Sequence, residues 1–175
     1  MTLEGKKVAF LVAEGVEDLE YYAVAMRLQE EGMIILTAAK DLNPIKGKNG
    51  LEIKPDTKIA DLDADDLFGL VLPGGWAPDK VRRYKEATDL VAKVNQQDKI
   101  IGIICHGGLL AISAKIVDGK KTIGSLGIKD DLLNAGASWV DEPAFRDGNQ
   151  VWGRVVADIP AFNRELVAAF KEAAA

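Results

Sequence analysis

The chain has 175 residues, of which 48% are hydrophobic and 28% charged, a composition typical of a globular domain and not of a disordered segment. Its 22 basic and 27 acidic residues give a net charge of −5, which argues against a nucleic-acid or anionic-membrane partner, since both attract a clustered basic excess. The apolar runs are shorter than the ~20 residues of a membrane helix, and the first residues lack a signal-peptide core. We therefore expect a single domain over residues 1–175 and a cytoplasmic location.

The chain holds one cysteine and one histidine, and the two are neighbours, Cys105 and His106. A single cysteine cannot form an intrachain disulfide, which fits a reducing compartment. A zinc site built from several His or Cys ligands cannot be assembled from this set, and we expect neither a metal nor a cofactor. Any catalytic triad that contains histidine must use His106.

Strand and helix patterns alternate along the first part of the chain. A continuous apolar run predicts a buried strand over 8–12, and helical spacing of apolar residues follows over 17–31. A second strand is expected at 33–38, so the three elements form a βαβ unit. The apolar positions of the helix are Leu19, Tyr22, Ala23 and Met26. Residues 43–57 contain an Asn-Gly pair and predict a protruding hairpin.

The same patterns continue to the end of the chain. We expect two further buried strands, at 69–72 and 100–104, and a helix over 78–95. The remaining predicted elements are helices at 109–115 and 128–135, a hairpin between 144–146 and 151–154, and a last helix capped by Asp158 that buries Phe162, Leu166 and Phe170. Together they predict an α/β protein, a three-layer sandwich around a mostly parallel sheet.

Cys105 has the sequence surroundings of a reactive residue. In open parallel sheets, ligands bind outside the carboxyl ends of the strands, and Cys105 directly follows the strand at 100–104. The glycines at 107 and 108 allow a tight turn into a helix, which predicts a nucleophile elbow. The positive end of that helix favours a thiolate, so a low thiol pKa is expected.

Two further loops supply candidate partners. Glycines at the end of a strand let backbone N–H groups face a bound oxygen, and Gly74 and Gly75 end the strand at 69–72. We expect an oxyanion hole from the N–H groups of Gly75 and His106. The His106 ring is a candidate base, but a residue next to an elbow nucleophile usually points its side chain away. Gly107 belongs to the same predicted binding loops.

Glu20 is the carboxyl group that we expect beside the sulfur. It borders the predicted apolar face of the first helix, whereas Glu17 and Asp18 suit capping and solvation of its first turn. Burial near the sheet edge would raise the pKa of Glu20. In its protonated form, Glu20 can donate a hydrogen bond to the Cys105 thiolate; in its ionised form, it would suppress the thiolate.

A series of motifs resembles the PfpI intracellular-protease branch of the DJ-1/PfpI superfamily. They keep the family order and span nearly the whole chain: GVEDLE (15–20), LVLPGG (70–75), APDKVR (77–82), IICHG (103–107), GIKDDLLNAGASWVDE (127–142), DGN (147–149) and ADIPAF (157–162). The resemblance implies a flavodoxin-like fold of the class I glutamine amidotransferase type, and a homodimer or sometimes a hexamer. It also implies that Cys105 is the nucleophile, with His106 and Glu20 beside it.

Asp79 stands where the family's peptidases have an acidic residue, usually Glu, that reaches the histidine of a neighbouring subunit. The sequence also departs from the family pattern at three other positions, Gly108, Ser125-Leu126 and Val156, where the family has proline, an aromatic-proline pair and proline. The loss of the aromatic residue at 125 opens or reshapes the pocket wall. The departures leave the nucleophile in place and weaken the expectation of peptidase activity.

The expected function is therefore that of a stress-response cysteine-dependent hydrolase. The first reading is deglycase or glyoxalase action on methylglyoxal or its adducts, with a small carbonyl or glycated substrate. The second is an intracellular cysteine peptidase completed by Asp79 across a subunit interface. The third is a non-enzymatic redox sensor or chaperone that uses oxidation of Cys105.

Overall fold

The computed structural model describes residues 2–175 and centres on a seven-stranded sheet in the order β10-β11-β7-β6-β1-β2-β5. All neighbouring strands in it are parallel except the β10–β11 hairpin. The strands are β1 (Lys7–Leu11), β2 (Ile34–Ala39), β5 (Thr57–Lys58), β6 (Gly69–Leu72), β7 (Ile100–Ile104), β10 (Ala144–Asp147) and β11 (Gln150–Gly153). The mostly parallel sheet and its four predicted central strands are confirmed.

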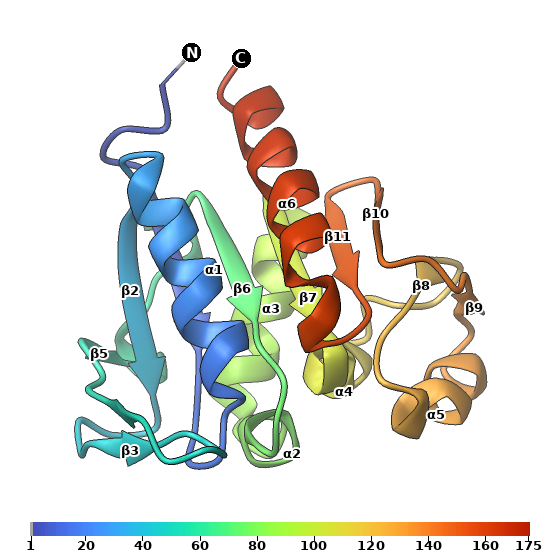
Figure 1. The fold of residues 1–175 in the computed structure, drawn as a ribbon, viewed down its shortest axis with the longest axis horizontal. Helices are drawn as coiled ribbons and strands as arrows, with labels where there is room; N and C mark the ends of the chain where they lie inside the picture. Colours follow the sequence, from blue (N-terminus) through green and yellow to red (C-terminus); the bar gives the residue numbers. More distant parts are fainter. Residues whose placement is uncertain (1) are drawn as a thin grey trace.

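Helices cover both faces of this sheet (Figure 1). One face carries α1 (Asp18–Glu30) and α6 (Ile159–Ala173), and the other carries α3 (Lys85–Gln96) and α4 (Gly108–Ser113), with α2 (Ala77–Val81) beside α4. The three-layer α/β sandwich is thus confirmed. None of the helices in residues 2–175 is both long and apolar enough to span a membrane.

Two small additions lie outside the main sheet. A hairpin of β3 (Ile45–Lys46) and β4 (Glu52–Ile53) confirms the predicted protrusion. A parallel pair, β8 (Lys121–Thr122) and β9 (Ser138–Trp139), packs with α5 (Lys129–Asn134) at the other end of the molecule (Figure 1).

The prediction of one helix over 78–95 is wrong, because the chain turns between α2 and α3. Tyr84 has an extended backbone, with φ −92° and ψ 118°, and this interrupts the helical hydrogen bonding. Asp158 occupies the predicted cap position of α6, but its carboxylate binds the Arg154 guanidinium, with contacts of 2.9 and 3.2 Å, and does not cap the helix.

The predicted buried face of α1 is wrong at two of its four positions. Leu19 and Met26 are 50% and 61% exposed, and the other two predicted positions are only partly buried against the core, whereas Glu20, Val24 and Leu28 are buried. The helix is rotated because its core face includes acidic residues with partners inside the protein, a feature that an apolar pattern cannot reveal. Leu19 and Met26 therefore lie on an apolar stripe at the surface.

The core packs tightly where α6 crosses β7. All five residues of β7 are buried, and the predicted core residues Phe162, Leu166 and Phe170 have no exposed surface. Gly102 in β7 permits this approach, since a Cβ there would lie 3.0 Å from both Leu166 and Phe162. A rigid strand thus leads directly into Cys105.

Candidate active site

Cys105 begins a turn of 3-10 helix directly after β7, and its backbone lies in the left-handed region with φ +58°. A non-glycine residue adopts this conformation only at a cost, and such strain concentrates at functional sites. The Ser125 N–H donates to the Cys105 carbonyl over 3.3 Å, and Gly124 packs against the same oxygen. The predicted nucleophile elbow is therefore present, and residues 124–125 support it from outside.

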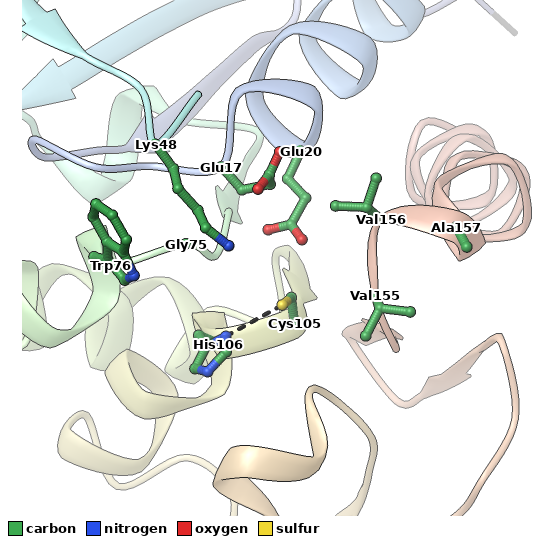
Figure 2. Close-up of a pocket in the computed structure, with 10 residues that line it drawn as sticks. All are labelled: Glu17, Glu20, Lys48, Gly75, Trp76, Cys105, His106, Val155, Val156 and Ala157. Carbon is green, nitrogen blue, oxygen red and sulfur yellow. Dashed lines mark hydrogen bonds between the residues drawn. The ribbon is translucent and has the colours of Figure 1, made fainter. Parts of the chain in front are cut away.

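A pocket of about 270 Å³ lies over the sulfur (Figure 2). Its lining residues come from the elbow, from the loop after β6, from the start of α1, from the β3–β4 hairpin and from residues 155–157: Glu17, Glu20, Lys48, Gly75, Trp76, Cys105, His106, Val155, Val156 and Ala157. Among residues 2–175, no group of three or more His, Cys, Asp or Glu side chains is placed to hold a metal ion.

Two loops of the pocket are joined to each other through their backbones. Val16 and Gly75 form an antiparallel bridge, and the Trp76 N–H donates to the Gly15 carbonyl over 2.9 Å. Gly75 has φ +70°, and a Cβ there would lie 2.4 Å from Gly15 O and from the Glu17 backbone nitrogen. Only glycine fits this position, and its N–H is thereby fixed near the sulfur.

Glu20 is fully buried between α1 and the loop after β6. Its Oε2 accepts a 2.6 Å hydrogen bond from the Gly74 N–H, and its Oε1 has no hydrogen-bond partner among the described residues. Burial raises the pKa of Glu20 from 4.5 to about 7, against the lowering effect of the Gly74 hydrogen bond. The predicted direction of this pKa shift is confirmed, and the carboxyl faces the sulfur (Figure 2).

The expected low pKa of Cys105 is wrong for the site with an ionised Glu20. Burial, followed by the negative charge of Glu20, raises the pKa of the Cys105 thiol from 9.0 to about 12. Hydrogen bonds from the backbone N–H groups of His106 and Gly75 lower it by less. The N–H donors therefore do not outweigh burial and like-charge repulsion.

The His106 ring lies beside the sulfur and does not point away, contrary to expectation. Its Nδ1 is 3.3 Å from Cys105 Sγ (Figure 2). Burial, followed by the positive charge of Lys48, lowers the pKa of His106, which favours a neutral ring. A neutral imidazole at this distance can accept the proton of the thiol.

Three other predicted site residues lie outside the pocket lining. The Gly74 N–H is committed to Glu20 and is not an oxyanion donor. Gly107 is buried against the end of β6, where a Cβ would lie 2.1 Å from Leu72 O, so it allows the elbow to pack. Asp79 is exposed on α2 and forms an ion pair with Arg83. A role for Asp79 across a subunit interface stays a prediction.

Lys48, Trp76, Val155 and Ala157 were not predicted as site residues, and Val156 was noted only as a departure from the family pattern. Lys48 comes from the tip of the β3–β4 hairpin, and Trp76 from the start of α2. A Lys next to an Asn-Gly turn and a short apolar segment before a helix have no chemical signature in one sequence. Only tertiary structure brings them to Cys105.

The buried carboxyl gives a testable pH dependence of stability. Because the pKa of Glu20 is raised by folding, the folded state holds this proton more tightly, and the free energy of unfolding falls as pH rises from about 4.5 to 7. At pH 8 the buried charge costs about 3 kcal/mol, at about 1.4 kcal/mol per pKa unit. The variant Glu20→Gln lacks this cost.

We expect the stability of Glu20→Gln relative to wild type to grow between pH 5 and pH 8 in urea unfolding experiments. His106 has a lowered pKa and gives the opposite slope, but it is present in both proteins and cancels in the difference. A difference that stays constant across this pH range would show that Glu20 titrates normally.

Comparisons with known proteins show the family of this chain. The sequence model described as the DJ-1/PfpI family matches residues 6–169. A deglycase of Pyrococcus horikoshii, PH1704, is 40% identical over 165 residues, which cover 94% of this chain and 99% of the relative. General stress protein 18 of Bacillus subtilis is 36% identical over 94% of this chain and 97% of its own.

Solved structures show the same architecture. A two-domain protein from Anabaena variabilis, with DJ-1/ThiJ/PfpI-like and ferritin-like domains, superposes with a TM-score of 0.91 at 32% identity, covering 93% of this chain and 47% of that one. DJ-1beta of Drosophila melanogaster superposes with a TM-score of 0.86 at 24% identity, over 97% and 96% of the two chains. With its family match, its relatives and its elbow cysteine, this chain belongs to the DJ-1/PfpI family.

Proposed function

We propose that this protein is a cytoplasmic stress-response hydrolase in which Cys105 attacks the carbonyl carbon of methylglyoxal or of its adducts. The observation that carries the proposal is the placement of the sulfur on a strained elbow beside a buried carboxyl whose pKa is about 7. A group with a pKa near the working pH is suited to carry protons during a reaction. The names of the relatives, a deglycase and a general stress protein, support the same chemistry.

The thiolate forms by moving a proton within the pocket. An ionised Glu20 beside a thiol and a protonated Glu20 beside a thiolate have the same net charge, so the second state adds no charge to the buried site. In that state, the carboxyl Oε1, which lacks a partner, carries the proton and donates it in a hydrogen bond to the sulfur, while the Gly75 and His106 N–H groups donate as well. His106 is an alternative acceptor of the thiol proton.

The reaction of methylglyoxal balances without an external oxidant or reductant. The sulfur forms a bond to the aldehyde carbon, and the aldehyde oxygen takes a proton to give a hemithioacetal. A base removes the hydrogen of that carbon while the neighbouring ketone oxygen takes a proton, which gives an enediol. The hydroxyl of the first carbon then loses its proton and the second carbon takes one, so that the first carbon is oxidised to a thioester and the second is reduced to an alcohol. Water then cleaves the thioester to lactate and the free thiol. Glu20 is the proton carrier that we propose for the middle step.

The N–H groups of Gly75 and His106 suit the oxygen that becomes negative in these steps. Both lie at the sulfur and are held by backbone structure, Gly75 through the bridge to Val16 and His106 through the elbow. Donors held in place before the reaction stabilise developing charge without reorganisation.

The role of Glu20 is tested by the pH dependence of alkylation of Cys105 with iodoacetamide. Glu20→Gln removes the repelling charge and keeps a donor, so its thiol pKa should fall below that of wild type. Glu20→Leu removes the donor as well. At pH 7 its Cys105 should react with iodoacetamide at a rate at least about tenfold lower than that of Glu20→Gln, since a hydrogen bond to a charged group contributes about 1.5–3 kcal/mol. An ordinary thiol pKa of about 8.5 in all three proteins would contradict the mechanism.

The reaction itself is tested by comparing wild type with Cys105→Ala. We expect wild type to convert methylglyoxal or to release it from adducts of amino acids, and Cys105→Ala to lose this activity at least ~1000-fold, because no other thiol is present in the chain. A peptide panel runs in parallel. If wild type converts neither the methylglyoxal substrates nor the peptides, and peroxide modifies Cys105 before the three methionines, the redox-sensor hypothesis replaces the enzyme hypothesis.

A peptidase is the second candidate, and the contact between His106 and the sulfur favours it. The Cys-His pair is 3.3 Å apart, yet among residues 2–175 no carboxylate orients the His106 ring. We propose that a homodimer, or a hexamer built from it, supplies Asp79 of a neighbouring chain in this position. The exposed apolar stripe of α1, with Leu19 and Met26, supports self-association.

Asp79→Ala decides between the one-chain and two-chain sites. If Asp79 acts across an interface, this variant should lower peptide turnover about tenfold or more and leave iodoacetamide alkylation of Cys105 largely unchanged, because the elbow, Glu20 and the N–H donors at the sulfur stay in place. The control is Asp89→Ala, which removes a similar exposed ion pair on α3. A monomer by light scattering at micromolar concentration, or full activity of Asp79→Ala, would exclude the shared site.

A further inference from the structure

The wall of the pocket carries a lysine for which the fold gives no partner. Lys48 Nζ points over Gly75 toward the space above Cys105 (Figure 2). Among residues 2–175, the exposed Lys48 side chain forms no ion pair within 4.0 Å, and its Nζ lies over the face of the Trp76 ring, 5.9 Å from the ring centroid. An unpaired ammonium group beside a nucleophile is available to an anion on the substrate.

The hairpin that carries Lys48 is fastened to the site and not to the main sheet. Its backbone is held on both sides of the lysine: the Lys48 N–H donates to Val16 O over 2.8 Å, and the Gly15 N–H donates to Lys46 O over 2.8 Å. Val16 and Gly15 belong to the same loop that bridges Gly75. The position of Lys48 is thus tied to the loops that form the oxyanion hole.

Asp18 is the positioning residue of this hairpin. It is buried at the start of α1, and its carboxylate accepts hydrogen bonds of 2.7 and 2.9 Å from the backbone N–H groups of Asn49 and Leu51. Gly47 lies flat against this carboxylate, since a Cβ there would be 2.2 Å from Asp18 Oδ1. The buried Asp18 carboxyl therefore fixes the location of the hairpin turn, and with it the location of Lys48.

Neither carboxyl group inside the pocket forms an ion pair with Lys48 within 4.0 Å. Glu17 Oε1 accepts from Asn49 Nδ2 over 3.1 Å, and Glu20 Oε2 accepts from Gly74. The charge of Lys48 nevertheless reaches the groups on both sides of the sulfur, since it lowers the pKa of Glu20 and that of His106. Its field therefore extends across the space where a substrate would lie.

We propose that Lys48 is a specificity-determining residue that selects substrates with a carboxylate within a few bonds of the carbon attacked by Cys105. This deepens the proposed function, on which it rests for the nature of that carbon as a carbonyl or hemithioacetal carbon. The substrate class is then an oxo acid, or a carbonyl adduct of a molecule with a free carboxylate, in preference to a neutral carbonyl compound of the same size.

Two alkylating reagents test the role of Lys48 without any turnover. Iodoacetate and iodoacetamide react with the same sulfur and have nearly the same shape, but only iodoacetate is an anion. Because Cys105 is the only thiol, the ratio of their rates reports this site alone, and any effect of Lys48 on the thiol pKa cancels in the ratio. We expect the iodoacetate-to-iodoacetamide ratio to fall about fivefold in Lys48→Met, the effect of opposite unit charges about 4 Å apart in water.

Two control variants sharpen this measurement. Lys48→Arg keeps the charge and should retain most of the wild-type ratio. Lys46→Met removes an exposed lysine of the same hairpin that does not line the pocket, and it should leave the ratio unchanged. An equal ratio in wild type and Lys48→Met, or an equal fall in Lys46→Met, would overturn the proposal.

A second test of the role of Lys48 compares the enzymatic turnover of two substrates that differ in charge. The hemithioacetal of methylglyoxal with N-acetylcysteine carries a carboxylate, and the one with N-acetylcysteine methyl ester does not. Wild type should prefer the first by kcat/KM, and Lys48→Met should lose this preference; an unchanged preference in Lys48→Met would overturn the proposal. Absence of turnover on both would refute the proposed function, and the alkylation ratio would still decide the role of Lys48.

Discussion

The hydrogen bond from the Gly74 N–H to Glu20 Oε2, 2.6 Å long, joins α1 to the loop after β6 at the point where Cys105 leaves the sheet. A Cβ on Gly74 would lie 2.5 Å from this oxygen and 2.9 Å from Cys105 Cβ, so nothing larger than glycine fits between the carboxyl and the cysteine. This contact explains why α1 buries an acidic residue among apolar ones. The elbow, the bridge between Val16 and Gly75 and the pocket are arranged around it.

Burial makes the two acids of the site depend on each other. Desolvation penalises both the carboxylate and the thiolate. The negative charge of Glu20 also raises the pKa of the Cys105 thiol, whereas the Cys105 thiol lowers the pKa of Glu20 as a hydrogen-bond partner. The pair therefore favours a single negative charge near neutral pH, and where that charge lies decides whether the sulfur is reactive. The hydrogen-bond donors at the sulfur, from Gly75 and His106, matter most when the charge is there.

Other segments of the chain complete the pocket around Glu20 and Cys105. Two surrounding segments are held to the loops of the site by backbone hydrogen bonds. The Ser125 N–H donates to the Cys105 carbonyl, and the Lys48 N–H donates to the Val16 carbonyl. A hairpin with only two residues in each strand would be weak by itself, and Asp18 stabilises it. The chemistry at the sulfur and the selection of substrates thus come from different parts of the chain.

Local sequence patterns were sufficient to predict the layered fold, the four central strands and the cluster of Cys105, His106, Gly75 and Glu20, because apolar runs, turn residues and the end of a strand are local signals. The buried face of α1 depends on the folded chain, since the partners of Asp18 and Glu20 lie about 30 and 54 residues away. The same holds for the orientation of the His106 ring toward the sulfur, for the rise in the pKa of Cys105 caused by burial and by the charge of Glu20, and for the entry of Lys48 into the pocket. Each of these depends on distances and on exclusion of water between distant segments, and neither quantity is written in the local pattern of residues.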